Sequence, residues 1–403
     1  MQKSIEPPYL TASEAAAELS VSLATLYAYV SRGLIRSEPT PDGRGKRYRA
    51  DDVRSLRARR APPKENGGDR AGGSFAWSTP VLDSAITLIG AEGPHYRGAS
   101  AVALCESASL EHVASLLWDV AEIDPFTEEF AVDERLARAM ADLGDMRPID
   151  RAAAIMALGA AHDPMAFNRT KAGRAATGAR IVRLVAALIA GTVPSSDPVH
   201  QLVARAWSQR EKSRADLIRR VLVLLADHEL NASAFAARVV ASTGASLYDV
   251  VAAGLSALKG PRHGGASLRA SRFLKTIADT DDVVGEVRHR AALGERFAGF
   301  GHFLYGGADP RGAALLTALG EAGADAKLVT HLPEAVREAT GEAANIDYAL
   351  AVMGMTMGLP ADSGMSLFAI ARTVGWIAHG IEQMESGGLI RPRARYTGPA
   401  PRD

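Results

Sequence analysis

Residues 254–267 read GLSALKGPRHGGAS and place one histidine, His263, between a Gly-Pro pair and a Gly-Gly pair. Glycines beside a histidine let the backbone approach a ligand closely and leave N–H groups free to bind an anion. A second histidine with glycine neighbours, His302, ends the sequence GFGH, and a third, His228, lies between two acids in the sequence DHE. One Gly–His pair is weak evidence. Two such pairs followed by an acid downstream indicate a ligand site.

The sequence around these histidines is mostly helical in pattern. Apolar residues recur at three- and four-residue spacing in 178–190, 214–225 and 232–241, and the chain is rich in alanine. A length of 403 residues allows two or three domains with a sizeable core. We therefore expect a mainly α fold.

The amino-acid sequences of the motifs and their order along the chain resemble those of the citrate synthase family, over roughly residues 77–398. The motifs that carry the resemblance are DSAITLIGAEGPHYRG (83–98), SLEHVASLLW (109–118), VLLADHELNAS (223–233), GLSALKGPRHGGAS (254–267), GFGHFLYGGADPR (299–311), NIDYALAVMGMTMGLP (345–360), LFAIARTVGWIAHGIEQ (367–383) and RPRARYTG (391–398). Several motifs in order are more specific than any one of them. The resemblance implies an all-α homodimer with a large domain (77–264 and 366–403), a small mobile domain (265–365) and an active site in the cleft between them.

The implied reaction joins acetyl-CoA to oxaloacetate, with water, to give citrate and CoA. Removing a proton from a methyl group beside a thioester needs a placed base and a stabiliser for the enolate oxygen. By the motif match, Asp347 is the base and His263 donates to the thioester oxygen. His302 matches the residue that protonates the ketone oxygen of oxaloacetate.

The resemblance also implies a substrate-binding set. His228 matches a histidine that binds oxaloacetate, and Arg311, Arg372 and Arg391 match three arginines that pair with its carboxylates. Arg391 is expected to reach across into the neighbouring subunit's site. CoA thioester is a substrate here, so we expect no resident cofactor, and no cluster of His, Cys, Asp or Glu has the spacing of a metal site. The remaining histidines, His379 among them, carry no predicted catalytic role.

Four positions depart from the family pattern. Gly306 replaces a basic residue that helps to hold CoA phosphates, and Ser267 ends the usual Gly-Gly-Ala-Asn. Leu225 replaces a polar residue before DHE, and Arg262 adds a charge beside His263 that could lower its pKa or bind a CoA phosphate. None removes a catalytic group, but together they leave the acyl-CoA open. Propionyl-CoA, giving 2-methylcitrate, is a rival to acetyl-CoA.

Residues 1–60 differ in charge from the rest, with eleven Lys or Arg against seven Asp or Glu. A capping box at Thr11 and Glu14, two short helices and a hairpin predict a winged helix-turn-helix, similar to the heads of MerR-type regulators and phage excisionases. The implied DNA contacts are Thr25, Arg32, Arg44, Lys46, Arg47 and Arg49. Dimerisation or protein docking is the alternative. The Pro- and Gly-rich stretch 61–76 is expected to be a flexible linker to a body spanning 77–403.

Composition excludes some classes of protein. Equal numbers of acids and bases, 46 each, argue against a generally basic coat for nucleic acid, and a single cysteine excludes a disulfide framework within one chain. No run approaches the roughly 18 apolar residues of a spanning helix, and the N-terminus lacks a secretory signal, so we expect a cytoplasmic protein with no membrane partner. Besides the two enzymes, a transcription regulator whose body senses a metabolite remains an interpretation.

Overall fold

The computed structural model describes residues 9–19, 21, 23–31, 34–40, 45–53, 56, 82–120, 122–127, 132–209, 211–392, 394 and 396–399. The chain divides into two compact units, Met1–Val81 and Leu82–Asp403. Each unit has a hydrophobic core of its own. The predicted linker 61–76 lies outside the described residues, and the predicted division into head, linker and two-domain body stays a prediction.

The first unit contains two short helices, and the sequence pattern predicts both. Helix α1 (Ala12–Glu18) begins at the expected capping box, because the Thr11 backbone N–H donates to Glu14 Oε2 (2.8 Å) and the Glu14 N–H donates to Thr11 Oγ1 (3.3 Å). Helix α2 (Leu23–Ser31) follows. Leu26 of α2 is fully buried in the small core that both helices share.

A three-stranded antiparallel sheet completes the first unit, in the order β1 (Tyr9–Leu10), β3 (Lys46–Arg49), β2 (Ser37–Pro39). The expected hairpin is present, but its first strand begins three residues later than the predicted 34–37. The reason is local: Ile35 is buried in the core, and Asp52 accepts two hydrogen bonds from the Arg36 guanidinium and one from its backbone N–H. Of the predicted last helix, 51–60, residues 51–53 are helical and most of the rest lies outside the described residues.

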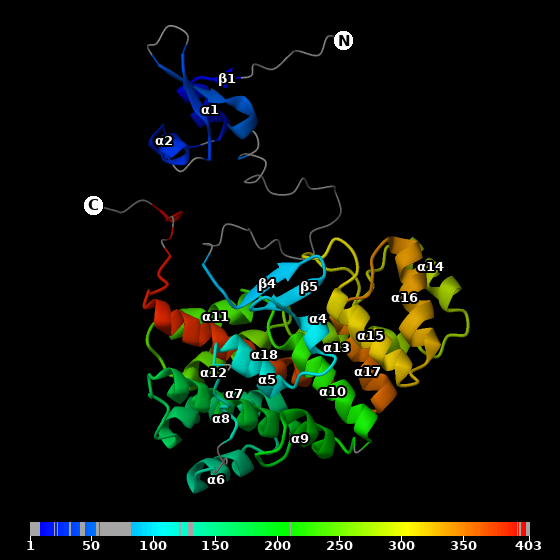
Figure 1. The fold of residues 1–403 in the computed structure, drawn as a ribbon. Coiled ribbons are helices and arrows are strands. Elements are labelled where there is room, and N and C mark those ends of the chain that lie inside the picture. The colour runs from blue at the N-terminus through cyan, green and yellow to red at the C-terminus, as the bar shows by residue number, and fades with distance from the viewer. Residues whose placement is uncertain are drawn as a thin grey trace. The chain divides into compact units, whose positions relative to one another are not determined.

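The second unit is mainly α-helical (Figure 1). Its helices are α4 (Ala101–Leu104), α5 (Leu110–Leu117), α6 (Glu134–Asp142), α7 (Pro148–His162), α8 (Lys171–Ala190), α9 (Val199–Ala206), α10 (Lys212–Leu225), α11 (Ala232–Ala241), α12 (Leu247–Leu258), α13 (Gly265–Ile277), α14 (Val283–Ala292), α15 (Pro310–Glu321), the π-helix η1 (Lys327–His331), α16 (Leu332–Thr340), α17 (Ile346–Met357) and α18 (Ser363–Ser386). None of the helices in the described part of the chain is long and apolar enough to cross a membrane.

Helix α18 is the central element of the second unit. It packs against α5, α8, α10, α11 and α12, and its side chains are buried over most of its length. Close packing against α12 depends on Gly254, since a Cβ there would lie 2.4 Å from the ring of the fully buried Trp376. A helix buried on all sides has no polar face to show in sequence.

Helices α13 to α17 form a second group, in which α13 and α15 pack against α17 and α14 packs against α16. Figure 1 shows α14, α15 and α16 together, at the opposite side of the unit from α7 and α12. An antiparallel sheet of β4 (Thr87–Gly90), β5 (Gly93–Tyr96) and β6 (Ala99–Ser100) also belongs to this unit. Tyr96 of β5 is fully buried and donates its hydroxyl to the Val223 carbonyl at the end of α10 (3.0 Å).

Candidate active site

Three aromatic rings from two loops meet at one place in the second unit. His228 lies in the turn between α10 and α11, whereas His302 and Tyr305 lie in the loop before α15. His228 Nε2 is 2.8 Å from the Tyr305 hydroxyl oxygen, and the His228 and His302 ring centroids are 5.6 Å apart. The structure therefore brings together two histidines that are 74 positions apart in the sequence.

The loop that carries His302 is tied to the start of α17. Gly299 and Gly301 both have positive φ, and a Cβ on Gly299 would lie 2.8 Å from the Cβ of Tyr348. The Asn345 N–H donates to the Gly299 carbonyl (2.9 Å) and its side-chain amide donates to the Gly301 carbonyl (2.8 Å). The glycines of GFGH thus serve a close approach between backbones. That approach fixes His302 relative to α17.

His302 is held as a neutral ring with a defined tautomer. The Leu304 backbone N–H donates to His302 Nδ1 (3.1 Å), so Nδ1 is an acceptor and the proton lies on Nε2. Burial, and after it the charge of Arg311, lower the pKa of His302 below its usual range. At neutral pH the ring can therefore donate one proton or hydrogen bond from Nε2.

His263 follows α12 and is fixed by two contacts. Its Nε2 lies 2.8 Å from the hydroxyl oxygen of Ser233, and its ring meets the ring of Phe368 edge to face at 5.9 Å. Burial, and after it the charge of Arg372, lower the pKa of His263 to about 4. The neighbouring Arg262 is exposed and is not among these causes. The pKa of His263 is therefore lowered by burial and by Arg372, and not by Arg262 as the sequence suggested.

Asp347 lies in the first turn of α17 without capping it. The cap is Asn345, whose side-chain oxygen accepts from the N–H groups of Asp347 (2.9 Å) and Tyr348 (3.3 Å). Within the described part of the chain, the Asp347 carboxylate forms no ion pair and accepts no hydrogen bond. Burial raises its pKa to about 6, with the charge of Asp309 adding to the effect and that of Arg311 opposing it. A carboxylate left free in this way is available as a base.

Arg372 is a buried cation whose guanidinium lies 4.5 Å from the centre of the Phe368 ring. Its side chain is fully buried in α18, and Nε donates to the Leu225 carbonyl (3.0 Å). Both terminal nitrogens, Nη1 and Nη2, are buried and have no hydrogen-bond acceptor among the described residues. Burial lowers the pKa of Arg372 to about 10. Unpaired buried donors are costly, and a carboxylate ligand would satisfy this pair.

Arg311 is buried as well, but it is already paired. Its Nε and Nη2 donate to the two oxygens of Asp309 at 3.0 and 2.9 Å, and Asp309 Oδ2 also accepts from the Ile346 N–H at the start of α17 (3.1 Å). The guanidinium lies 5.8 Å from the centre of the Tyr305 ring. Asp309 therefore links the predicted binding residue Arg311 to the helix that carries Asp347.

Six of the seven predicted body residues belong to one neighbourhood, joined by these contacts and by the charges of Arg311 and Arg372. Those two charges lower the pKa of His228 further, after burial, to well below its usual value. Arg391 is the exception: it is exposed beyond the end of α18, with no ion pair to a described residue. Its predicted position in a partner's site stays a prediction, as do the roles of the other six.

Sequence reasoning missed four residues of this neighbourhood: Ser233, Tyr305, Asp309 and Phe368. All four lie within the quoted motifs, but their residue types do not mark them. Their signal is position. Ser233, Tyr305 and Phe368 contact predicted histidines that are distant in the sequence. Asp309 pairs with Arg311 two residues on, and only its contact with the Ile346 N–H depends on the fold. Tyr305 is the clearest case, because its ring touches both histidines and faces Arg311.

The predicted DNA-contact residues of the first unit are only partly available. Arg47 pairs with Glu38 (3.2 Å) and lies 4.1 Å above the Tyr9 ring, and Arg49 pairs with Asp51 (3.2 Å). Lys46 is exposed and Thr25 is half-buried. Arg32 and Arg44 lie outside the described residues. The two predicted arginines of β3, Arg47 and Arg49, are thus engaged by acids.

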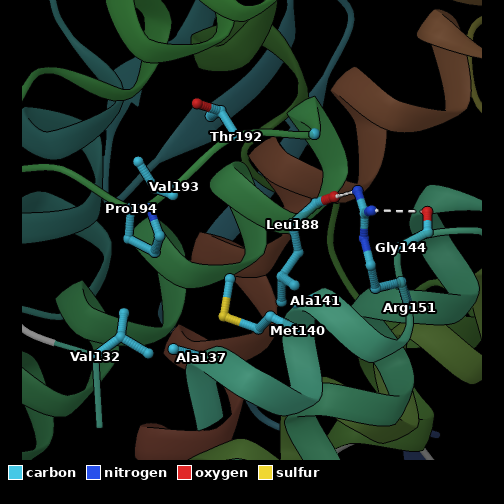
Figure 2. Close-up of a pocket in the computed structure, with 11 residues that line it drawn as sticks. Val132, Ala137, Met140, Ala141, Gly144, Arg151, Leu188, Thr192, Val193 and Pro194 are labelled. Carbon is cyan, nitrogen blue, oxygen red and sulfur yellow. Dashed lines mark hydrogen bonds between the residues drawn. The ribbon is translucent and has the colours of Figure 1, made fainter. Parts of the chain in front are cut away.

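A cavity of about 590 Å³ lies elsewhere in the second unit and contains none of these groups (Figure 2). It lies among α6, α7 and the end of α8, and its lining is mostly apolar. Its one charged residue, Arg151, points its guanidinium at the Leu188 and Gly144 carbonyls. We assign it no chemistry. Among the described residues, no group of three or more His, Cys, Asp or Glu could hold a metal ion.

Comparison with known proteins matches this unit. The family model "Citrate synthase, C-terminal domain" matches residues 75–393. A citrate synthase of Haloferax volcanii is 34% identical over 354 residues, covering 79% of this chain and 93% of that protein. A 2-methylcitrate synthase of Mycobacterium tuberculosis is 29% identical over 333 residues, covering 75% and 84%. The structure of a ternary complex of Thermoplasma acidophilum citrate synthase with carboxymethyl coenzyme A and oxaloacetate is 26% identical, with a TM-score of 0.66 over 81% of this chain and 96% of that one.

Proposed function

This chain belongs to the citrate synthase family, and on that premise we propose that its second unit joins the acyl group of an acyl-CoA to oxaloacetate. The enzyme is of the citrate synthase type, an acyltransferase that converts the acyl group into an alkyl group on transfer. The overall reaction consumes water and yields citrate and CoA when acetyl-CoA is the substrate. Oxaloacetate and a CoA analogue are the ligands named for the Thermoplasma relative.

The observation that carries this proposal is the buried guanidinium of Arg372, whose two terminal nitrogens lack an acceptor among the described residues, beside the neutral histidines. Oxaloacetate is a dicarboxylate, and a planar guanidinium pairs with a carboxylate through two parallel hydrogen bonds. Nη1 and Nη2 of Arg372 have no acceptor among the described residues, so a substrate carboxylate removes an existing desolvation cost. His228 and Arg311 complete the binding set that we propose.

In the first step, Asp347 removes a proton from the carbon next to the thioester carbonyl. The electron pair moves toward the thioester oxygen, where a hydrogen bond from His263 stabilises the enolate. We assign this donor to Nδ1 of His263, with the Ser233 hydroxyl donating to Nε2. The low pKa of His263 keeps the ring neutral, so the ring stabilises the enolate oxygen through a hydrogen bond and not as a cation.

In the second step, the nucleophilic carbon attacks the ketone carbon of oxaloacetate. The ketone oxygen takes the proton on Nε2 of His302, which the contact of Nδ1 with the Leu304 N–H places there. Water then attacks the thioester carbonyl carbon and the carbon–sulfur bond breaks, so that its oxygen stays with the product as a carboxylate. One proton of the water goes to the leaving CoA thiol and the other to solvent, and the proton held by Asp347 balances the one that His302 gave up. The two proton transfers of the condensation therefore each have a named donor or acceptor in this chain.

Thiol release with oxaloacetate tests the proposal directly, comparing acetyl-CoA with propionyl-CoA at matched concentrations. Release of CoA that depends on oxaloacetate supports a condensing enzyme. If folded protein that still binds oxaloacetate releases no thiol from either thioester, the result contradicts a condensing enzyme and favours a regulator whose body senses a metabolite. Omitting oxaloacetate is the control for simple thioester hydrolysis.

The second candidate reaction is 2-methylcitrate synthesis. It is favoured by the similarity to the Mycobacterium tuberculosis 2-methylcitrate synthase. Ser267, which is buried where the family pattern has asparagine, and Gly306, which is exposed where the pattern has a basic residue, leave the choice of acyl-CoA open. One methylene group in a pocket changes discrimination by only about 1–3 kcal/mol. The ratio of the two rates in the same assay decides between the products.

We also propose that the enzyme is a homodimer whose partner completes the site. Arg391 supports this, because it is exposed and lies outside the neighbourhood that the other six residues form. An Arg391→Ala variant mixed with a Asp347→Ala variant tests it. If Arg391 acts across the interface, mixed dimers regain one complete site, and activity rises above that of either variant alone. No gain on mixing contradicts the proposal.

For the first unit we propose a winged helix-turn-helix that contacts nucleic-acid phosphate. Support comes from the order of α1, α2 and the β2–β3 hairpin, and from exposed Lys46. The paired Arg47 and Arg49 count against a strong phosphate contact. If the unit binds DNA and the body is silent in the thiol assay, the protein is a regulator with a metabolite-sensing body.

A further inference from the structure

The turn that carries His228 is held in a conformation that its own residues disfavour. Glu229, the third residue of DHE, has φ of 55°, a left-handed conformation in which a residue with a Cβ is strained. Such a conformation persists only where the surroundings determine it. The contacts around Asp227 show what determines it here.

Asp227 is a fully buried carboxylate that faces two ways. Its Oδ2 accepts a hydrogen bond from the Glu229 N–H (3.0 Å), which closes the turn. Its Oδ1 faces helix α18, 3.4 Å from Nε2 of His379, whose side chain is also fully buried. This is an electrostatic contact between two polar atoms that have no hydrogen-bond partner among the described residues. One carboxylate thus connects the backbone beside His228 to a side chain two turns along α18 from Arg372.

The tautomer of His379 follows from its other neighbour. His379 Nδ1 lies 3.4 Å from Nη1 of Arg238, and a guanidinium can only donate. Nδ1 is therefore the acceptor and Nε2 carries the proton that faces Asp227. Arg238 is itself held by Glu382 and by Gln383 (3.1 Å), so the orientation of His379 is set from α11 and α18 together.

Helix α18 also makes room for the turn. Gly375 lies midway between Arg372 and His379, and a Cβ there would lie 2.4 Å from Asp227 Oδ1. The Gly375 N–H donates to the Ala226 carbonyl (3.1 Å), directly before the turn. The segment from Arg372 to His379 therefore forms one surface against which residues 225–229 are seated.

We infer that His379 is a positioning residue of the reaction: through Asp227 it fixes the turn that presents His228 to oxaloacetate. The inference rests on the proposed condensation, in which His228 binds oxaloacetate. His379 itself contacts neither substrate and acts only through Asp227. Its loss should therefore affect oxaloacetate and leave the thioester largely unaffected.

The test is steady-state kinetics of the full-length protein, varying each substrate in turn, for His379→Leu and His379→Gln. Leucine removes the polar Nε2–H that lies 3.4 Å from Asp227 Oδ1, and glutamine keeps an N–H at this position. For His379→Leu we expect kcat/KM for oxaloacetate to fall on the order of 10- to 100-fold, the effect of a small misplacement of a substrate-binding group. The KM for acyl-CoA should change less than about threefold. His379→Gln should recover most of the loss.

A matched control is His200→Leu, which removes a half-buried histidine of α9 outside this network and should leave both KM values unchanged. If His379→Leu does not fold, the pair Asp227→Asn and Asp227→Asn/His379→Gln replaces it. In Asp227→Asn, the amide N–H group of asparagine faces the Nε2–H of His379, so two donors oppose each other. In the double variant, glutamine can turn its carbonyl toward the asparagine N–H. The double variant should therefore bind oxaloacetate more tightly than the single one.

The outcomes separate the two proposals. Normal oxaloacetate kinetics in His379→Leu, equal losses for both substrates, or no recovery with glutamine would overturn the positioning role. If the wild-type protein is silent but binds oxaloacetate, the dissociation constants of the same variants decide. If the wild-type protein neither turns over nor binds oxaloacetate, the proposed function has failed, and the role of His379 falls with it.

Discussion

At the scale of single residues, burial determines which protonation states the site can use. Asp347 has a pKa raised to about 6, and only its ionised form can accept a proton. We expect kcat/KM for the acyl-CoA to be level above pH 7 and to fall about tenfold per pH unit well below pH 6. His263 does not cause this limb, because its pKa is lowered to about 4. A pH–rate profile between pH 5 and 8 checks the apparent pKa.

Substitution of the same carboxylate separates catalysis from binding. Asp347→Ala should lower kcat by about 10²–10⁴-fold, the usual contribution of a positioned base, while oxaloacetate affinity stays within about threefold. Turnover and calorimetric binding, measured on the same preparation, make the comparison. Asp279→Ala, at an acid between α13 and α14, is the control. Normal turnover by the Asp347 variant would show that another group is the base.

Arg311 and Arg372 are both buried, yet their replacement should have opposite effects on stability. Arg372→Met removes donors that lack an acceptor, so the free energy of unfolding should stay equal or rise. Arg311→Met leaves the buried Asp309 carboxylate unpaired and should cost about 3–5 kcal/mol. Thermal unfolding with and without oxaloacetate measures both. The substrate should stabilise the wild type but not Arg372→Met. Strong destabilisation of Arg372→Met would mean that the contacts of its guanidinium with Phe368 and the Leu225 carbonyl outweigh the cost of the two unsatisfied donors.

The sequence allowed the six clustered residues to be predicted, but not how each is held. Two glycines mark His302, and its motif is readable without a structure. That Leu304 selects its tautomer, or that Asp309 occupies one edge of Arg311, depends on angles within a loop. Tyr305 and Ser233 were missed for the same reason, since a hydroxyl group becomes informative only when the fold places a histidine 2.8 Å away.

At the scale of elements, glycines within helices show where two helices approach closely. Gly254→Ala puts a methyl group against the buried Trp376 ring and should destabilise by about 1–3 kcal/mol, although alanine is the better helix former. Gly320→Ala in α15 is the matched control, because its new Cβ meets only Val329, at 3.7 Å, and it should be neutral or slightly stabilising. Chemical denaturation measures both. Equal effects would contradict close packing as the cause.

Helices were predictable where apolar residues recur at three- and four-residue spacing, and the predicted 178–190 lies within α8 although that segment is almost entirely buried. The predicted 232–241 coincides with α11, and the predicted 214–225 begins two residues inside α10. Strands β4 and β5 were not predicted, because four residues each, with Gly and Pro among them, give too short a pattern. The strand shift in the first unit has the same origin as the missed hydroxyls. Asp52 holds Arg36 from a distance in sequence, and no local pattern reports that contact.

At the scale of the whole molecule, two separate cores predict two separable activities. The hydrophobic residues of the first unit form one cluster and those of the second form another. The proposed site uses residues of the second unit only, and the family match begins at residue 75. Residues 82–403 alone should therefore keep kcat and both KM values within about twofold of the full chain. A large loss would show that the first unit contributes to the site.

The same truncation tests what the first unit does. Residues 1–60 have an excess of four bases, whereas residues 61–403 hold 35 bases and 39 acids, so retention on heparin should come from the first unit alone. Because Arg47 and Arg49 are paired with acids, we expect weak retention that salt abolishes early, and Lys46→Ala should reduce it further. The second unit's unchanged turnover is the internal control for folding. Retention that survives removal of residues 1–81 would exclude the phosphate contact and leave protein docking as the role of this unit.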